Sequence, residues 1–338
     1  MKIKKIVLII VAVTFLFNLP VCGQEKEIEM TNALNYHKSM LGAMKSVDLL
    51  KVPFGNEISV IGGPDQDTEN LTEGVPYAFR VTAEGDFWIL DSANRALKLF
   101  GAEGRLKNSI SLSNMGRLVR DFAFGPDGGF WLLSPIEGFI YQIDREGKIV
   151  NRIEGFCDAR ALETGVNDSL LVDMPLMNSV LRFGADGVLG EQISYENGLS
   201  LHEGIGGKLL GIEMDERNVK LNMRTVASPA QTVTLAEFPL DIEDQKVSYA
   251  GAEILGRDAS GSIYLNLIAC HEDGPIYRDR LYRCNQLGKP VAFTDIIAMP
   301  YLAPDLPRSR IVAPDGRVVV YYVDKQGYVL AGYSITQP

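Results

Sequence analysis

The chain has 338 residues, of which 46% are hydrophobic and 22% are charged, and its formal net charge is −10 at pH 7. This composition is that of a globular protein and excludes a disordered or low-complexity chain. The negative charge repels the phosphate backbone of nucleic acids, so we expect no nucleic acid among the partners.

Residues 1–23 have the pattern of a secretory signal peptide. Three lysines among the first five residues precede an apolar run from Ile6 to Phe17, and a cleavage region follows at residues 21–23. This segment is too short and wrongly flanked for a stable membrane span. Its removal would take away three lysines and lower the net charge from −10 to −13. We therefore expect an exported protein that is periplasmic, at the cell surface or extracellular.

Two fates of Cys22 stay open. Cleavage after Gly23 satisfies the small-residue rule for signal cleavage and removes Cys22. Alternatively, Leu19-Pro20-Val21-Cys22 loosely resembles a lipobox, although Val21 is a poor fit to it. Cys22 would then be the lipidated first residue. Its acyl chain would be the only membrane tether, because the acidic surface repels anionic lipid.

Residues 24–45 show no strand pattern, and we expect them to form a helical or loose extension. Two short strand-like segments follow this extension, at residues 47–52 and 58–61. Both segments precede the repeats that make up the rest of the chain.

A turn containing glycine, followed by a hydrophobic strand, recurs six times from residue 84 onward. The first two copies are residues 84–90 and 127–133. Weaker copies start at Asn167, Gly206, Gly261 and Gly316. The intervals between copies are 39 to 55 residues. A repeat of this length built from short strands is typical of a β-propeller, in which each repeat forms one blade.

Each repeat also carries a second turn, which indicates two hairpins and hence four antiparallel strands. Gly104, Gly147 and Gly187 follow the first turn by 19 or 20 residues, and Gly288 follows it after a longer loop. Glycine supplies the positive φ that tight hairpins need. On the second strand of the blades we expect a column of residues that fills the gaps between blades: Trp88, Trp131, Leu170, Leu209, Tyr264 and Val319.

The last repeat is short of one strand. It has strand-like residues at 318–323 and 328–333, and no further strand-like segment follows them. One of the two N-terminal segments is therefore predicted to complete the sixth blade and close the ring. The sequence thus predicts an all-β fold, a six-bladed β-propeller over residues 46–338 that is closed by an N-terminal strand.

Residues 91–100 resemble the strand–Asp–loop–Asn-Arg–strand core of NHL repeats, and residues 178–183 echo it. Residues 47–338 as a whole resemble the six-bladed NHL/TolB-like propellers that are common among secreted bacterial proteins and lipoproteins. The first three repeats match well, and the last three have diverged. The resemblance implies a fold more than an activity, because such propellers include binding scaffolds, lactonases and lyases.

Three cysteines lie beyond the signal peptide: Cys157, Cys270 and Cys284. No two of them have the spacing of a metal finger. Cys270 ends one expected strand and Cys284 lies in the next, so the two could meet across an antiparallel pair. A Cys270–Cys284 disulfide is therefore a hypothesis for an oxidising compartment.

Long loops gather on one face of the predicted propeller. The glycine turns on the other face are short, whereas residues 271–280 and 296–309 form long connections in blade five and before blade six. Loops on a rigid scaffold often carry function. The candidate ligand-binding residues in these two loops are His271, Tyr277, Arg278, Arg280 and Tyr301.

Three further arginines are candidates for ligand binding. Arg120, Arg160 and Arg310 each lie just before or at the start of the first strand of a blade, the strand nearest the central channel. Together they would suit an anionic ligand such as a carboxylate, which a guanidinium holds through two bonds. In the alternative interpretation, each arginine pairs with a nearby carboxylate, such as Asp121 or Asp158, and fixes a loop.

Few residues point to catalysis. The three histidines, His37, His202 and His271, have no spacing typical of a metal pair or a catalytic triad. The chain also has no nucleophile elbow, phosphate loop or dinucleotide fingerprint. We therefore assign no catalytic residue, no metal ligand and no cofactor from the sequence.

The sequence favours an exported or lipid-anchored propeller that binds a peptide, a partner protein or a glycan. The alternative is an enzyme with its site in the central channel, either a metal-dependent lactonase or hydrolase that uses a divalent metal, or a lyase. Asp91, Asp173 and Asn266 lie at or near the ends of second strands, but they do not match the ligand set of propeller lactonases. Acid and amide side chains converging on one channel point would favour the enzyme, and paired ions would favour the binding module.

Overall fold

The computed structural model describes residues 46–63, 76, 78–116, 118–194, 199–224, 231–240, 246–272, 276–296, 310–324 and 327–335. The predicted signal peptide with Cys22 and the predicted extension up to residue 45 lie outside these ranges. Tyr301 lies outside them as well. No helix among the described residues has the length and apolar character needed to cross a lipid bilayer.

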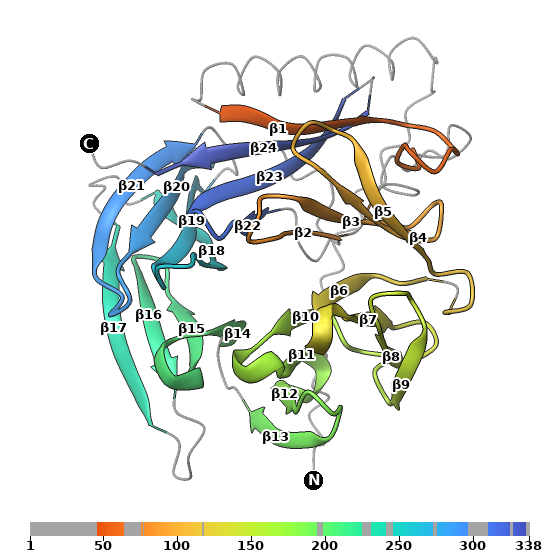
Figure 1. The fold of residues 1–338 in the computed structure, drawn as a ribbon. Coiled ribbons are helices and arrows are strands. Elements are labelled where there is room, and N and C mark those ends of the chain that lie inside the picture. The colour runs from red at the N-terminus through yellow and green to blue at the C-terminus, as the bar shows by residue number, and fades with distance from the viewer. Residues whose placement is uncertain are drawn as a thin grey trace, which may run out of the picture.

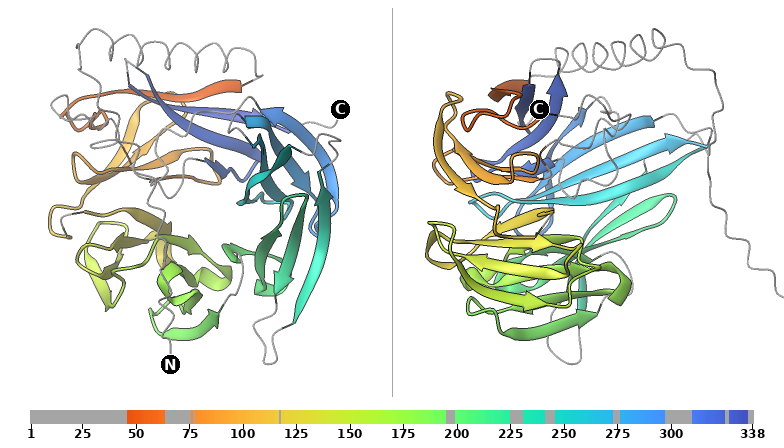
Figure 2. Two further views of the ribbon diagram at one scale, coloured as in Figure 1. Left: turned by 180° about the vertical axis from the view of Figure 1, so that it is seen from behind. Right: turned by 90° about the vertical axis from the view of Figure 1, so that its right-hand side faces the viewer.

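Six four-stranded antiparallel sheets surround a central axis, and each sheet is one blade of a β-propeller (Figures 1 and 2). Blade one consists of β2 (Ala78–Val81), β3 (Phe87–Asp91), β4 (Ala96–Phe100) and β5 (Leu106–Ser111). Blade two consists of β6 (Asp121–Phe124), β7 (Phe130–Ser134), β8 (Phe139–Ile143) and β9 (Ile149–Glu154). Blade three consists of β10 (Ala161–Thr164), β11 (Leu170–Met174), β12 (Ser179–Phe183) and β13 (Leu189–Ser194).

The last three blades follow the same order. Blade four consists of β14 (Leu199–Glu203), β15 (Leu209–Met214), β16 (Asn218–Arg224) and β17 (Thr232–Pro239). Blade five consists of β18 (Val247–Arg257), β19 (Ile263–His271), β20 (Ile276–Cys284) and β21 (Pro290–Ile296). Blade six consists of β22 (Arg310–Val312), β23 (Arg317–Asp324), β24 (Gly327–Ser334) and the N-terminal β1 (Ser46–Pro53). The first strand of each blade is innermost, since β6 contacts β2 and β10, β14 contacts β10 and β18, and β18 contacts β22.

The N-terminal strand completes blade six, which confirms the predicted closure. β1 pairs antiparallel with β24 from Ser46 opposite Tyr333 to Pro53 opposite Gly327. Of the two N-terminal segments, residues 47–52 form this strand, whereas Ile61 forms only an isolated bridge with Phe54. The first and last strands of the propeller therefore share one sheet, and the ring has no open seam between blades six and one.

Apolar side chains from both faces of each blade fill the spaces between blades. Every residue of β3, β7 and β11 is buried, because each of these sheets lies between two others. Trp88 packs edge-to-face against Phe130 of blade two, with 4.8 Å between ring centroids. Trp131 is fully buried in the cluster between blades two and three. Both tryptophans are therefore packing residues.

The predicted column of gap-filling residues is right in four blades and shifted by one residue in two. Trp88, Trp131, Tyr264 and Val319 pack toward the following blade. Leu170 and Leu209 pack toward the preceding blade instead. Leu171 and Leu210 take their places in the column.

The cause of this shift is the shape of the first turn in blades two, three and four. There the turn is a short 3-10 segment, namely η1 (Pro126–Gly128), η2 (Val166–Asp168) or η4 (Ile205–Gly207). Its last two residues both have positive φ, as at Asn167 and Asp168 in η2. In blades three and four the repeats are aligned on the first of these two residues, Asn167 and Gly206, rather than on the second. This alignment shifts the expected column by one residue. Because strand side chains alternate between faces, a one-residue error assigns each residue to the wrong face.

The predicted Cys270–Cys284 disulfide is wrong, and Cys157, Cys270 and Cys284 are free thiols. β19 and β20 do pair, but Cys270 lies opposite Ile276 and Cys284 lies opposite Ile263. The two cysteines are therefore at opposite ends of the same ladder. Since a strand rises about 3.3 Å per residue, their separation far exceeds the Cα distance of roughly 6 Å that a disulfide requires.

Candidate functional site

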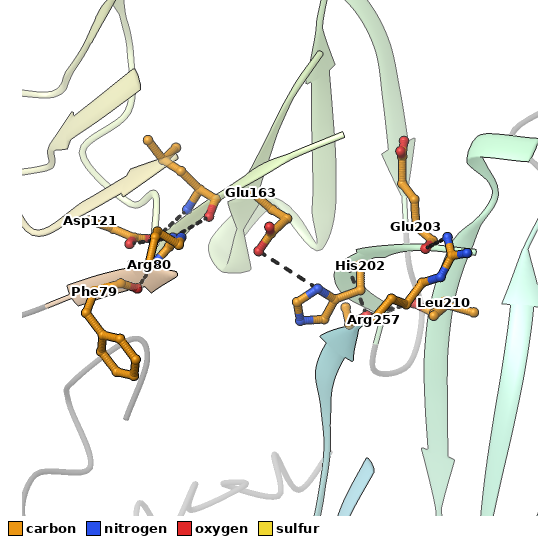
Figure 3. Close-up of polar contacts among 10 residues, drawn as sticks. Phe79, Arg80, Asp121, Glu163, His202, Glu203, Leu210 and Arg257 are labelled. Carbon is orange, nitrogen blue, oxygen red and sulfur yellow. Dashed lines mark hydrogen bonds and ion pairs between the residues drawn. The ribbon is translucent and has the colours of Figure 1, made fainter. Parts of the chain in front are cut away.

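Arg80 of β2 connects the first three blades at the centre of the ring (Figure 3). Its Nη2 lies 3.0 Å from Asp121 Oδ1 of β6 and donates to the Leu162 carbonyl of β10 at 3.3 Å. Asp121 Oδ2 accepts a hydrogen bond from the Leu162 backbone N–H at 2.8 Å. The Arg80 and Asp121 side chains are 8% and 0% exposed. A buried ion pair with its remaining lone pairs and donors satisfied in this way fixes the relative position of three innermost strands.

Glu163 of β10 and His202 of β14 form a second contact across blades near the same centre. Glu163 Oε2 lies 3.8 Å from His202 Nδ1, and Figure 3 shows the carboxylate pointing toward the imidazole. The two side chains are 22% and 15% exposed, so solvent reaches both. A carboxylate beside an imidazole forms an ion pair when the histidine is protonated, and the same two groups can exchange protons with a bound molecule.

Glu203, the neighbour of His202, connects blades three, four and five. Its Oε1 lies 2.7 Å from Arg182 Nη2, and its Oε2 accepts a hydrogen bond from the Val166 backbone N–H at 2.6 Å. Arg257 Nη1 donates to the Glu203 carbonyl at 2.9 Å (Figure 3). Glu203 is therefore held from both neighbouring blades.

Arg310, one of the three predicted channel arginines, belongs to a buried network between blades five and six. Its Nη1 donates to Asn266 Oδ1 and lies 3.9 Å from Asp279 Oδ2. Asn266 Nδ2 in turn donates to Asp279 Oδ1. Burial raises the pKa of Asp279 above its ordinary value, and the opposing effects of Arg310 and Asn266 do not cancel this rise. Arg310 thus holds a carboxylate of the protein itself.

The other two predicted arginines have different surroundings. Arg160 Nε donates to Asp173 Oδ2 at 2.6 Å, and its side chain is 66% exposed. The pairing interpretation thus holds for Arg160, although its partner is Asp173 rather than Asp158. The Nε of Arg120 is buried and has no hydrogen-bond partner in the described chain. A ligand role for Arg120 stays a prediction.

The blade-five candidates lie mostly in strands rather than in a loop. His271 ends β19, and Tyr277, Arg278 and Arg280 belong to β20, because the two strands extend further than the sequence predicted. Arg280 forms an ion pair with Asp295, and the hydrogen bond to Asp295 raises the pKa of Arg280. Its guanidinium also stacks over Phe293 at 4.2 Å from the ring centroid.

A cleft of about 430 Å³ lies between blades five and six, at the ends of the strands next to the short glycine turns. Blade five contributes Asp258, Tyr264 and Arg283, and blade six contributes Asp315, Arg317 and Ser334. The first turns of the two blades meet beside it, where the Ala259 N–H donates to the Pro314 carbonyl at 2.9 Å. We refer to this feature as the blade five–six cleft.

Sequence reasoning missed Arg80 and Arg283, which are the arginines with the most distinctive surroundings. Arg80 is the only charged residue of β2, and a charge inside a short apolar strand is a usable signal of a buried partner. Arg283 stands in β20 with two other arginines, Arg278 and Arg280, so the sequence alone offers no signal that separates it from them.

In the described ranges, no three His, Cys, Asp or Glu side chains are grouped so that they could hold a metal ion. Asp91, Asp173 and Asn266, the strand-end residues considered for such a site, do not converge. Asp91 contacts Lys98, Asp173 contacts Arg160, and Asn266 contacts Asp279.

Comparison with known proteins identifies a fold and no family. No protein-family model matches the chain, and no curated protein matches it either. A crystal structure of a DUF4221 family member from Bacteroides vulgatus aligns with a TM-score of 0.51 and 9% identity, over 87% of this chain and 99% of that one. At this identity the similarity shows a shared fold alone.

Weaker similarities include virginiamycin B lyase from Staphylococcus aureus. One structure of that lyase aligns with a TM-score of 0.47 and 13% identity, over 86% of this chain and 99% of the lyase. A second structure, with quinupristin, aligns with a TM-score of 0.40 and 16% identity, over 58% of this chain and 64% of the lyase. The chain thus spans less than two thirds of that second structure.

Proposed function

We propose that this six-bladed propeller is a binding module for a peptide, a partner protein or a glycan. The observation that carries the proposal is the pairing of buried charges across neighbouring blades. Arg80 holds Asp121, and Arg310 holds Asp279, with both pairs largely buried. These charged groups are engaged in joining blades into a rigid ring, which is the kind of support on which loops and clefts bind ligands.

We further propose that the protein is exported and of the NHL/TolB-like type, periplasmic, at the cell surface or extracellular. The basic and apolar segment of residues 1–23 supports export, and the fate of Cys22 decides between free secretion and a lipid anchor. The Asp91 region supports the NHL likeness, because Asp91 accepts hydrogen bonds from the Asn94 backbone at 3.1 Å and side chain at 2.9 Å.

The experiment that tests binding is thermal melting of the purified protein against divalent metals, neutral sugars, sugar acids and acidic peptides. A ligand present well above its dissociation constant raises the melting temperature by mass action. We expect a rise with an organic ligand from this panel, or capture of a specific partner protein in a pull-down. A rise with divalent metals alone would contradict the proposal and favour the enzyme.

A second candidate function is an enzyme, a lyase or a lactonase-type hydrolase, with its site at the ring centre. The Glu163–His202 pair favours it, because both side chains are partly exposed and could act as acid and base on a molecule bound there. His202→Asn, which keeps a polar group near the position of Nδ1 and removes the basicity of the ring, would abolish turnover in that case.

A further inference from the structure

The blade five–six cleft contains an arginine that forms no ion pair with a carboxylate in the described part of the chain. Arg283 of β20 lines the cleft, and its Nε is buried without a hydrogen-bond partner. In the described part of the chain, Arg283 forms no ion pair with a carboxylate, whereas Arg317 in the same cleft lies 2.6 Å from Asp315. A buried donor without a partner is uncommon in folded proteins and calls for an explanation.

The two acids of the cleft are already engaged by other groups. Asp258 accepts hydrogen bonds from Ser260 Oγ at 2.6 Å, the Ser262 backbone at 2.9 Å and Tyr264 Oη at 3.0 Å. Although burial acts in the opposite direction, these bonds lower the pKa of Asp258, so it stays ionised. Asp315 accepts from both the backbone and the side chain of Arg317.

Tyr264 adds no negative charge to the cleft. Burial and the hydrogen bond to Asp258 raise the pKa of Tyr264 well above its usual range, and the nearby Arg283 only partly offsets this rise. The phenol therefore stays neutral at physiological pH. Arg283 is then the one lining cation, among the described residues, that forms no ion pair with an acid.

We propose that the blade five–six cleft binds a small organic carboxylate through the guanidinium of Arg283. This inference rests on the proposed binding function and assigns it a site and a ligand class. The planar fork of a guanidinium matches the two oxygens of a carboxylate, and the cleft volume of about 430 Å³ suits a ligand of about the size of a monosaccharide. Asp258 and Asp315 lie nearby and oppose a more highly charged anion such as a phosphate.

Two sources could supply this chemistry, a sugar acid or the acidic side chain of a peptide. The test is isothermal titration of the purified protein with glucuronate, with glucose as the uncharged counterpart, and with a short glutamate-containing peptide against its glutamine counterpart. We expect at least one of the two carboxylate probes to bind, and its uncharged counterpart to bind about tenfold more weakly or not at all. The source is the probe that binds more tightly.

Arg283→Gln removes the charge and keeps polarity, and we expect it to weaken carboxylate binding by about tenfold or more. Arg283→Lys keeps the charge without the planar fork, so we expect an intermediate affinity. Arg145→Gln is the matched control, because Arg145 lies in a glycine turn of blade two with its side chain 72% exposed. This control should bind as the unaltered protein does, and melting curves should show that each variant is folded.

The outcomes separate this inference from the function on which it rests. Carboxylate binding that survives Arg283→Gln in a folded variant would overturn the site. Binding of neutral ligands or of phosphate in preference to carboxylates would overturn the ligand class. In both cases the binding function would stand, whereas conversion of a bound ligand to a product that is lost in His202→Asn would overturn the binding function itself.

Discussion

Lys98 and Asp91 form an ion pair in the interior of blade one, with 2.7 Å between Lys98 Nζ and Asp91 Oδ2 and side chains 2% and 0% exposed. Asp91 also accepts hydrogen bonds from the Gly62 backbone N–H at 3.1 and 3.2 Å, and Lys98 donates to the Val60 carbonyl. The pair therefore holds the segment that follows the closing strand β1 against blade one. This contact joins the N-terminal segment to blade one, in addition to the β1–β24 ladder that joins it to blade six.

Replacing one partner of this pair should destabilise the protein strongly. Lys98→Met leaves the Asp91 carboxylate buried without its cation, and we expect the free energy of unfolding to fall by about 3 kcal/mol. Urea denaturation measures the change. The matched control is Lys107→Met, because Lys107 makes an equally short contact with Asp86 at 2.7 Å but is 44% exposed. The control should leave the midpoint unchanged, and equal losses in the two variants would contradict the account.

Removal of the closing strand should abolish cooperative folding. A chain without residues 24–61 lacks β1 and leaves β24 with an open edge in blade six. We expect a broad melting transition in place of the sharp one, as measured by calorimetry. A truncated protein that melts as sharply and at the same temperature as the intact one would show that β1 is dispensable.

Asp279 should make stability depend on pH. Because its pKa is raised in the folded state, the native protein binds this proton more tightly than the unfolded chain does. The stabilising contribution is therefore present below the unfolded pKa and is lost as pH rises through the raised native pKa. Asp279→Asn lacks this dependence. Relative to the unaltered protein, the variant should gain stability as the pH rises above about 4, the ordinary pKa of an aspartate, as measured by urea denaturation. An unchanged difference across this range would contradict the account.

The three thiols should react with alkylating reagents at very different rates. Cys157 is exposed. Burial raises the pKa of Cys284 to about 12, so Cys284 stays protonated and unreactive at neutral pH. Cys270 is partly buried and its pKa is also raised, mainly by burial. We expect fast labelling of Cys157, slow labelling of Cys270 and labelling of Cys284 only in denaturant. The intact mass of the denatured, unreduced protein should show that all three cysteines are labelled. If Cys270 and Cys284 both stayed unlabelled under these conditions, the result would support a disulfide between them and contradict the structure.

The six blades and the closing strand could be predicted because their signals are local. Glycine turns such as those at Gly85 and Gly261 have the positive φ that the hairpins require, and they recur in the sequence at blade spacing. The missing strand of the last repeat left only the N-terminal segments to complete the ring. The register of blades three and four was not predictable in the same way, because two adjacent residues of each turn have positive φ.

The candidate site was harder to predict because its contacts join distant parts of the chain. Arg80 bonds to Asp121 and Leu162, which are 41 and 82 residues away. Arg283 is distinguished by the absence of an acidic partner in the described chain, which no local pattern encodes. The disulfide hypothesis failed for the same reason: neighbouring strands were expected, but only the register showed that Cys270 and Cys284 lie at opposite ends of the ladder.

The central claim is that the propeller binds its ligand without transforming it. The most direct measurement is to incubate the protein with the ligand that raises its melting temperature most and to follow the ligand by mass spectrometry. We expect the ligand to be recovered unchanged, with His202→Asn binding it as the unaltered protein does. Appearance of a product that is lost in His202→Asn would contradict the claim and identify the Glu163–His202 pair as part of an active site.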